Sequence, residues 1–150
     1  MVEMILSGEK FDQESFQIFC AEEDLEFPED LVSFVALNND CEFEDNFIKI
    51  DNERYSIKYL YGSTKERYSN IAKQYEDYED RVPKGLIPIG RDDFENQICI
   101  AIDDEHYGKI YFWDHETMDP LFEMESDIQI DQMPLLASSF TEFINKLENV

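Results

Sequence analysis

The sequence is short of positive charge: 12 Lys and Arg stand against 36 Asp and Glu, and the formal net charge is -24. A field of that sign repels nucleic acid and anionic lipid, because both carry dense negative charge. We therefore expect no direct binding to DNA, RNA or a membrane. The same field speeds the encounter with a basic partner. Acidity also favours solubility or adaptation to high salt. Composition alone does not distinguish this explanation from binding to a basic partner.

Cysteine is scarce as well. Cys20, Cys41 and Cys99 are an odd number at wide spacing, with no Cys-x-x-Cys pair, and this usage fits a reducing cytosol. The first twenty residues mix charged side chains such as Glu3 and Lys10 with the apolar ones. A signal-peptide core and a membrane span are therefore both unexpected, and we predict a cytoplasmic location.

Motifs that identify enzymes are missing from the sequence. It contains no GxSxG elbow, no GxxxxGK or GxGxxG phosphate loop and no EF-hand pattern. None of the cysteines has the basic neighbours that lower a thiol pKa. We expect no enzymatic activity, no cofactor and no metal ion.

The sequence does contain the material for a core. Hydrophobic residues make up 43% of the 150 residues and aromatic residues 14%. A chain of this length buries about 70% of its unfolded surface on folding. We expect residues 1–150 to form one domain.

Four segments favour helices. A short one is expected within residues 11–27, and Pro28 starts the next. Ser63 and Glu66 have capping-box spacing, which predicts a helix that ends before Pro83. A second capping box, at residues 139 and 142, predicts a C-terminal helix with an apolar stripe that includes residues 136 and 140.

Alternating apolar residues predict the strands. Residues 47–62 form a hairpin about a turn at 51–53, and residues 96–102 (NQICIAI) form a central strand with isoleucines on one face and Cys99 on the other. KIYFW (109–113) is its partner strand, and PLFEM (120–124) is a weaker candidate. The predicted class is α+β: a mostly antiparallel central sheet with N-terminal helices, one inserted helix and a C-terminal helix packed on it.

Asp114, His115 and Glu116 follow the aromatic strand and have three possible roles: a metal site, an acid/base pair, or the polar end of a strand. Neighbours on a strand point to opposite faces, so His115 joins the two carboxylates only if the chain bends. The one other histidine, His106, precedes the same strand, a poor arrangement for a zinc site. We favour the polar strand end. The tyrosines at 55, 59, 61 and 111 and Trp113 are either core residues or an exposed binding surface.

The order of four segments along the chain is informative: FPEDLVSFVALNND (27–40), PKGLIPIGRDDFENQICIAI (83–102), YGKIYFWDHE (107–116) and LLASSFTEFINKL (135–147). Together they resemble the SUKH superfamily, over about residues 27–147. Asn39 and Asp40 stand where the family pattern has paired glycines, and Glu95 stands where it has Gly before Asn96. Positive φ angles suit glycine better than these residues. In the family pattern YFWDHE belongs to a structural strand.

The resemblance implies an immunity protein that binds and neutralises a cognate basic toxin of a polymorphic or contact-dependent system, and we expect this toxin to be a nuclease. A regulatory or scaffold module of the same fold is the alternative, and a metal-dependent hydrolase ranks last. We expect the partner at one end of the sheet, where antiparallel pairing brings two acidic turns together. The predicted partner-binding residues are Asp92, Asp93, Glu95, Trp113, Asp114, Glu116 and Asp119.

Overall fold

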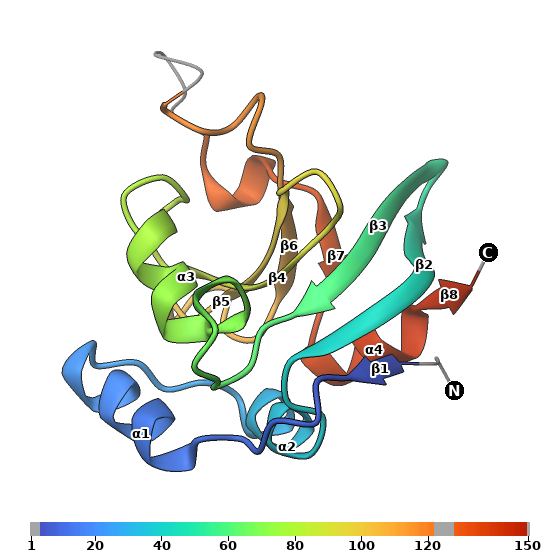
Figure 1. Ribbon diagram of the computed structural model, residues 1–150. Helices are drawn as coiled ribbons and strands as arrows, with labels where there is room; N and C mark the ends of the chain where they lie inside the picture. The colour runs from blue at the N-terminus through green and yellow to red at the C-terminus, as the bar shows by residue number, and fades with distance from the viewer. Residues whose placement is uncertain (1–3, 122–127, 150) are drawn as a thin grey trace.

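The computed structural model describes residues 4–121 and 128–149 and shows one antiparallel sheet with helices packed on it (Figure 1). The strands are β1 (Met4–Leu6), β2 (Cys41–Ile50), β3 (Glu53–Leu60), β4 (Leu86–Arg91), β5 (Gln97–Ala101), β6 (Ile110–Trp113), β7 (Leu135–Ala137) and β8 (Glu148–Asn149). The helices are α1 (Gln13–Glu22), α2 (Glu29–Leu37), α3 (Ile71–Tyr78) and α4 (Phe140–Lys146), with 3-10 turns η1 (Arg67–Ser69) and η2 (Ile130–Gln132). This confirms the predicted α+β class.

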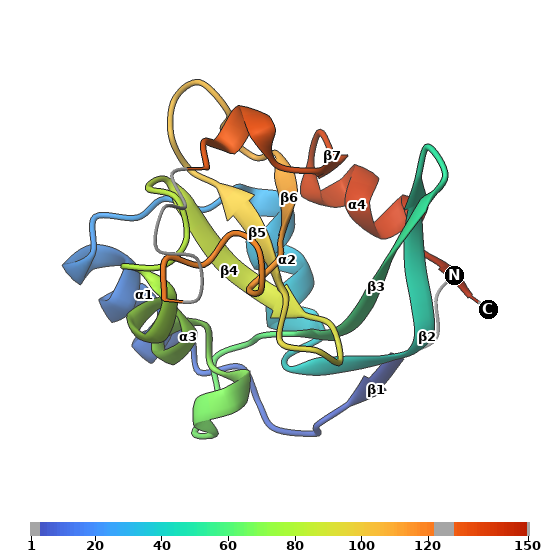
Figure 2. The ribbon, with the colours of Figure 1, turned by 90° about the horizontal axis from the view of Figure 1, so that it is seen from above.

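The strands pair in chain order from β1 to β7, and β8 joins β2 beside β1. Each connection therefore links neighbours, and α3 is the helix inserted between β3 and β4 (Figure 2). Within the described ranges, no helix combines the length and apolarity that crossing a membrane requires.

The middle of the sheet is buried on both faces. Ile98 and Ile100 of β5 lie in the main core, which also holds Phe140 and Phe143 of α4. Cys99 lies in a second apolar cluster on the opposite face, where α3 and η2 contribute side chains. The predicted central strand, apolar on both sides, is confirmed.

The start of α3 differs from the prediction. Asn70 caps this helix, because its side-chain oxygen accepts a hydrogen bond from the N–H of Lys73 at 3.1 Å. The predicted capping box at Ser63 and Glu66 is wrong. The Ser63 hydroxyl instead donates to the carbonyl of Asp12, 51 residues earlier, at 2.8 Å. A long-range contact thus uses the side chain that local spacing assigned to the helix.

The other predicted boundaries are closer. Ser139 caps α4 by accepting from the N–H of Glu142 at 3.1 Å, as expected, although Leu136 lies on β7 rather than on the helix. The β2–β3 hairpin turns at Asp51, with a φ of 56°, and β2 begins six residues earlier than predicted, at Cys41. The weak strand candidate PLFEM falls mostly outside the described residues.

Candidate partner-binding site

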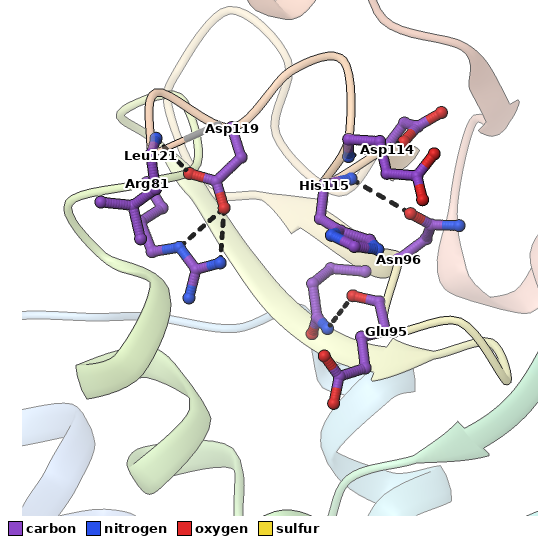
Figure 3. Close-up of polar contacts among 9 residues, drawn as sticks. Arg81, Glu95, Asn96, Asp114, His115, Asp119 and Leu121 are labelled. Atoms are coloured by element: carbon purple, nitrogen blue, oxygen red, sulfur yellow. Dashed lines mark hydrogen bonds and ion pairs between the residues drawn. The ribbon is translucent and has the colours of Figure 1, made fainter. Parts of the chain in front are cut away.

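Two acidic loops meet at one end of the sheet, as the antiparallel pairing predicts. Gln97, at the start of β5, lies opposite Trp113, at the end of β6. The N–H of His115 donates to the side-chain oxygen of Asn96 at 3.1 Å, which joins the loop before β5 to the loop after β6 (Figure 3). We call residues 92–96 and 114–119 the acidic end.

Asp92 organises this end from inside and offers little surface to a partner. It is 5% exposed. One carboxylate oxygen accepts from the N–H groups of Phe94 and Asn96, at 2.8 and 2.9 Å, and the other accepts from the Asn96 side chain at 2.9 Å. The prediction that Asp92 contacts a partner therefore needs correction: its carboxylate is engaged in folding the loop on itself.

Asp119 also lies inside the protein. It is fully buried and paired with Arg81, which follows α3, and its second oxygen accepts from the N–H of Leu121 at 2.9 Å (Figure 3). The Arg81 guanidinium also lies over the ring of Tyr78, 4.5 Å from its centroid. The carboxylate fixes the loop after β6 to the end of α3, so we withdraw Asp119 from the predicted contact surface.

Trp113, the predicted aromatic anchor, is fully buried. It lies on the Cys99 face of the sheet, and Tyr78 of α3 packs edge-on against it with 5.6 Å between ring centroids. Helix α3 therefore covers the face of the sheet that carries Trp113, whose burial the sequence pattern alone did not decide. Trp113 is a core residue, and this part of the prediction is wrong.

The four tyrosines considered from the sequence are also buried or half-buried. Tyr61 and Tyr111 are buried, while Tyr55 and Tyr59 are half-buried. Burial raises the pKa of the Tyr61 phenol, which stays protonated and donates to the side-chain oxygen of Gln97 at 2.7 Å. These residues do not form the exposed aromatic sheet face considered from the sequence.

The surface of the acidic end includes the remaining predicted residues and one that was not predicted from the sequence. Asp93, Glu95 and Glu116 are exposed, and Asp114 is half-buried. Phe94, between two of these carboxylates, is 74% exposed. Its position inside an acidic turn, away from any alternating pattern, was the signal available in the sequence.

Glu95 adopts a left-handed backbone conformation, with a φ of 68°. Asp40, at the other lost glycine, has a φ of 51°. Both turns thus keep glycine-like conformations without glycine. At Glu95 the carbonyl oxygen accepts from the Gln97 side chain at 2.9 Å, and Gln97 is itself held by buried Tyr61. Such strain persists where surrounding contacts determine the backbone.

Asp114, His115 and Glu116 form a turn. Strand β6 ends at Trp113, and an Asp114 carboxylate oxygen accepts from the N–H of Glu116 at 2.9 Å. The N–H of Met118 donates to the carbonyl of Asp114 at 2.8 Å, closing the turn. This geometry matches the polar strand end favoured from the sequence.

A different trio, Asp103, Glu105 and His106, could bring three ligand atoms within 4.8 Å of one another, and it is the one such group within the residues described. Both ring nitrogens of His106, however, lie 2.7 Å from carboxylates, those of Asp103 and Asp131. Two such contacts require both nitrogens to donate, which is the pattern of an imidazolium and unlike that of a metal ligand. These hydrogen bonds raise the pKa of His106.

A surface hollow of about 470 Å³ is lined by residues of α3 and β4 and of the segments beside them. Its lining is mainly apolar, including Leu25, Leu86 and Ile87, and its charged residues are Glu79, Lys84 and Asp103. These side chains supply no nucleophile activated by a base, so the hollow offers no catalytic set.

Comparison with known proteins identifies the family to which this chain belongs. The model of the SMI1 / KNR4 family (SUKH-1) matches residues 10–146. The chain belongs to this family. The match begins at residue 10, so α1 lies within it, although the resemblance read from motifs began near residue 27. Membership in this SUKH-1 family is typical of immunity proteins, which are generally non-enzymatic and bind a cognate toxin.

A similar curated protein is the SPbeta prophage-derived uncharacterized protein YokK of Bacillus subtilis (strain 168). It is 38% identical over 80 residues, which cover 53% of this chain and 35% of that protein. The chain thus matches about a third of the length of this relative.

Proposed function

We propose that this SUKH-1 protein is an immunity protein that binds a cognate basic nuclease toxin through the acidic end and blocks its active-site groove. The observation that carries the proposal is the exposed acidic surface of the acidic end. Asp93, Glu95 and Glu116 are exposed on two joined loops at one end of the sheet, and the exposed Phe94 lies between Asp93 and Glu95 in the chain. A nuclease groove is basic because it binds phosphates, so these carboxylates complement it.

Inhibition would follow from occupancy, without chemistry. Carboxylates in the groove occupy the cations that otherwise contact the nucleic-acid backbone, and the bulk of the domain excludes the substrate. The overall charge of -24 steers the encounter. Neither step requires a cofactor or a metal ion.

Under this proposal a gene next to this one encodes the toxin, and the test uses its toxin domain, here called the adjacent toxin domain. Cells that express this domain should survive when the immunity protein is co-expressed. The purified pair should form a complex, and the complex should no longer cleave nucleic acid. Absence of binding between the purified proteins, or cleavage at an undiminished rate in their mixture, would refute the proposal. Binding without any toxic activity to inhibit would favour the regulatory or scaffold alternative.

A further inference from the structure

Phe94 is an exposed aromatic at the tip of the connection between β4 and β5. Its side chain is 74% exposed, and exposed carboxylates flank it in the sequence at Asp93 and Glu95. We infer that Phe94 is the affinity anchor of the acidic end and inserts into an apolar pocket on the toxin whose rim is basic. This inference rests on the function proposed above and adds the residue that holds the complex together.

The loop that carries Phe94 is fixed before any partner arrives. The buried Asp92 carboxylate accepts from the N–H of Phe94 and from both the N–H and the side chain of Asn96, while the N–H of Asp92 donates to the carbonyl of Asn96. Asn96 in turn accepts from the N–H of His115 across the two loops. Because the backbone at Phe94 is already held, binding has little backbone entropy left to remove, which favours an anchor at this position.

The same loop carries a conformational cost. The left-handed φ of 68° at Glu95 is unfavourable for a residue with a Cβ atom. The side chain of buried Gln97, itself held by buried Tyr61, donates to the carbonyl of Glu95 and keeps it in place despite this cost. The chain therefore combines a strained backbone with an exposed phenyl ring at one tip. Each lowers stability or solubility, and a binding function explains both.

The charges around Phe94 identify the class of occupant. A second copy of this chain would bring another field of -24 toward Asp93, Glu95 and Glu116, so like charges oppose self-association through this tip. A basic protein surface meets the same carboxylates with attraction. Rim carboxylates then govern the association rate, while the buried ring governs dissociation.

The experiment compares Phe94→Ala with Tyr68→Ala in binding the adjacent toxin domain. Tyr68, on η1, is 69% exposed and serves as a matched control, since both changes remove an exposed ring. Phe94→Ala should weaken binding by about 30-fold or more, mainly through faster dissociation. Tyr68→Ala should bind within about twofold of the unmodified protein, because surface contacts outside a hot spot carry little energy. Phe94→Leu should retain part of the affinity.

Three outcomes decide the inference. Unchanged affinity of Phe94→Ala, with tight binding by the unmodified protein, overturns the anchor and leaves the proposed function standing. Absence of binding by the unmodified protein overturns both. A concentration-dependent dimer in sedimentation that Phe94→Ala abolishes would show a second copy as the occupant and also overturn the inference. Thermal unfolding of each variant should match the unmodified protein, because both side chains are largely exposed.

Discussion

Arg81 and Asp119 form an ion pair in which the carboxylate is fully buried. The guanidinium donates to one Asp119 oxygen from Nε at 2.8 Å and from Nη2 at 2.5 Å. Arg81→Ala would leave this buried carboxylate without its counter-charge. We expect the free energy of unfolding, measured by urea denaturation, to fall by about 3–5 kcal/mol.

A matched control for this pair is Arg67→Ala, which removes the partner of Asp77. Both members of that pair are substantially exposed, so the loss should stay below about 1 kcal/mol. Equal losses in the two arginine variants would show that burial of Asp119 does not set the strength of its pair.

Glu95 provides a test of backbone strain. The left-handed conformation costs a residue with a Cβ atom about 1–2 kcal/mol, and the greater freedom of unfolded glycine offsets about 0.5–1 kcal/mol of any relief. Glu95→Gly should therefore raise the free energy of unfolding by about 0.5–1 kcal/mol. Glu95→Gln removes the same charge and keeps the strain, so its stability should not rise. A similar gain in both variants would assign the effect to charge.

His106 should make stability depend on pH. Hydrogen bonds to Asp103 and Asp131 raise the pKa of His106 above its ordinary value of 6.5, while burial opposes the shift. The folded state thus holds the proton more tightly than the unfolded state. The resulting stabilisation is fully present below pH 6.5 and is lost as pH rises through the folded-state pKa.

The groups that face the imidazole are Asp103, Asp131 and the ring of Tyr111, with Glu105 beside it. An NMR titration of His106 should give a midpoint above 6.5. His106→Gln should remove most of the decline in stability between about pH 6.5 and 9. A midpoint at or below the ordinary value would contradict this arrangement.

The acidic end should control how association responds to salt. The Debye length shrinks from about 30 Å at 0.01 M to about 8 Å at 0.15 M salt. The association rate with the adjacent toxin domain should fall by about tenfold or more over this range, with little change in dissociation. Asp93→Asn, Glu95→Gln and Glu116→Gln combined should flatten the dependence. A rate indifferent to salt in the unmodified protein would mean that the acidity serves solubility.

Local patterns predicted the central part of the fold well. Alternation in NQICIAI placed Ile98 and Cys99 on opposite faces, and antiparallel pairing then brought the two acidic loops together. Both inferences depend on strand geometry alone, which local sequence determines. The cap at Ser139 succeeded for the same reason.

Predictions failed where a distant segment decides the outcome. The Ser63 hydroxyl contacts Asp12 rather than a helix start. Trp113 is buried because α3 packs over its face, and Asp119 is buried because Arg81 lies beside it. Phe94 was not predicted as a site residue because a lone aromatic residue in a polar turn belongs to no periodic pattern. For Ser63, Trp113 and Asp119 the environment comes from another part of the chain, which local spacing does not reveal.

The most direct test of the account is the affinity of two charge-reversal variants for the adjacent toxin domain, measured by calorimetry. The first changes Asp93, Glu95 and Glu116 to Lys, all exposed at the acidic end. The second changes three exposed acids around the end of α1, namely Glu22, Glu23 and Glu26, to Lys and so alters net charge equally. Asp92 is left intact because it folds the loop.

Equal net charge means that long-range steering is reduced alike in both variants, so any difference between them reports contact. The account predicts that the first variant binds about 100-fold or more weakly than the unmodified protein, because three carboxylates lose their cationic partners and meet like charge. The second should lose less than about tenfold. Near-normal affinity in the first variant, with strong loss in the second, would place the toxin interface at the end of α1 and contradict the account.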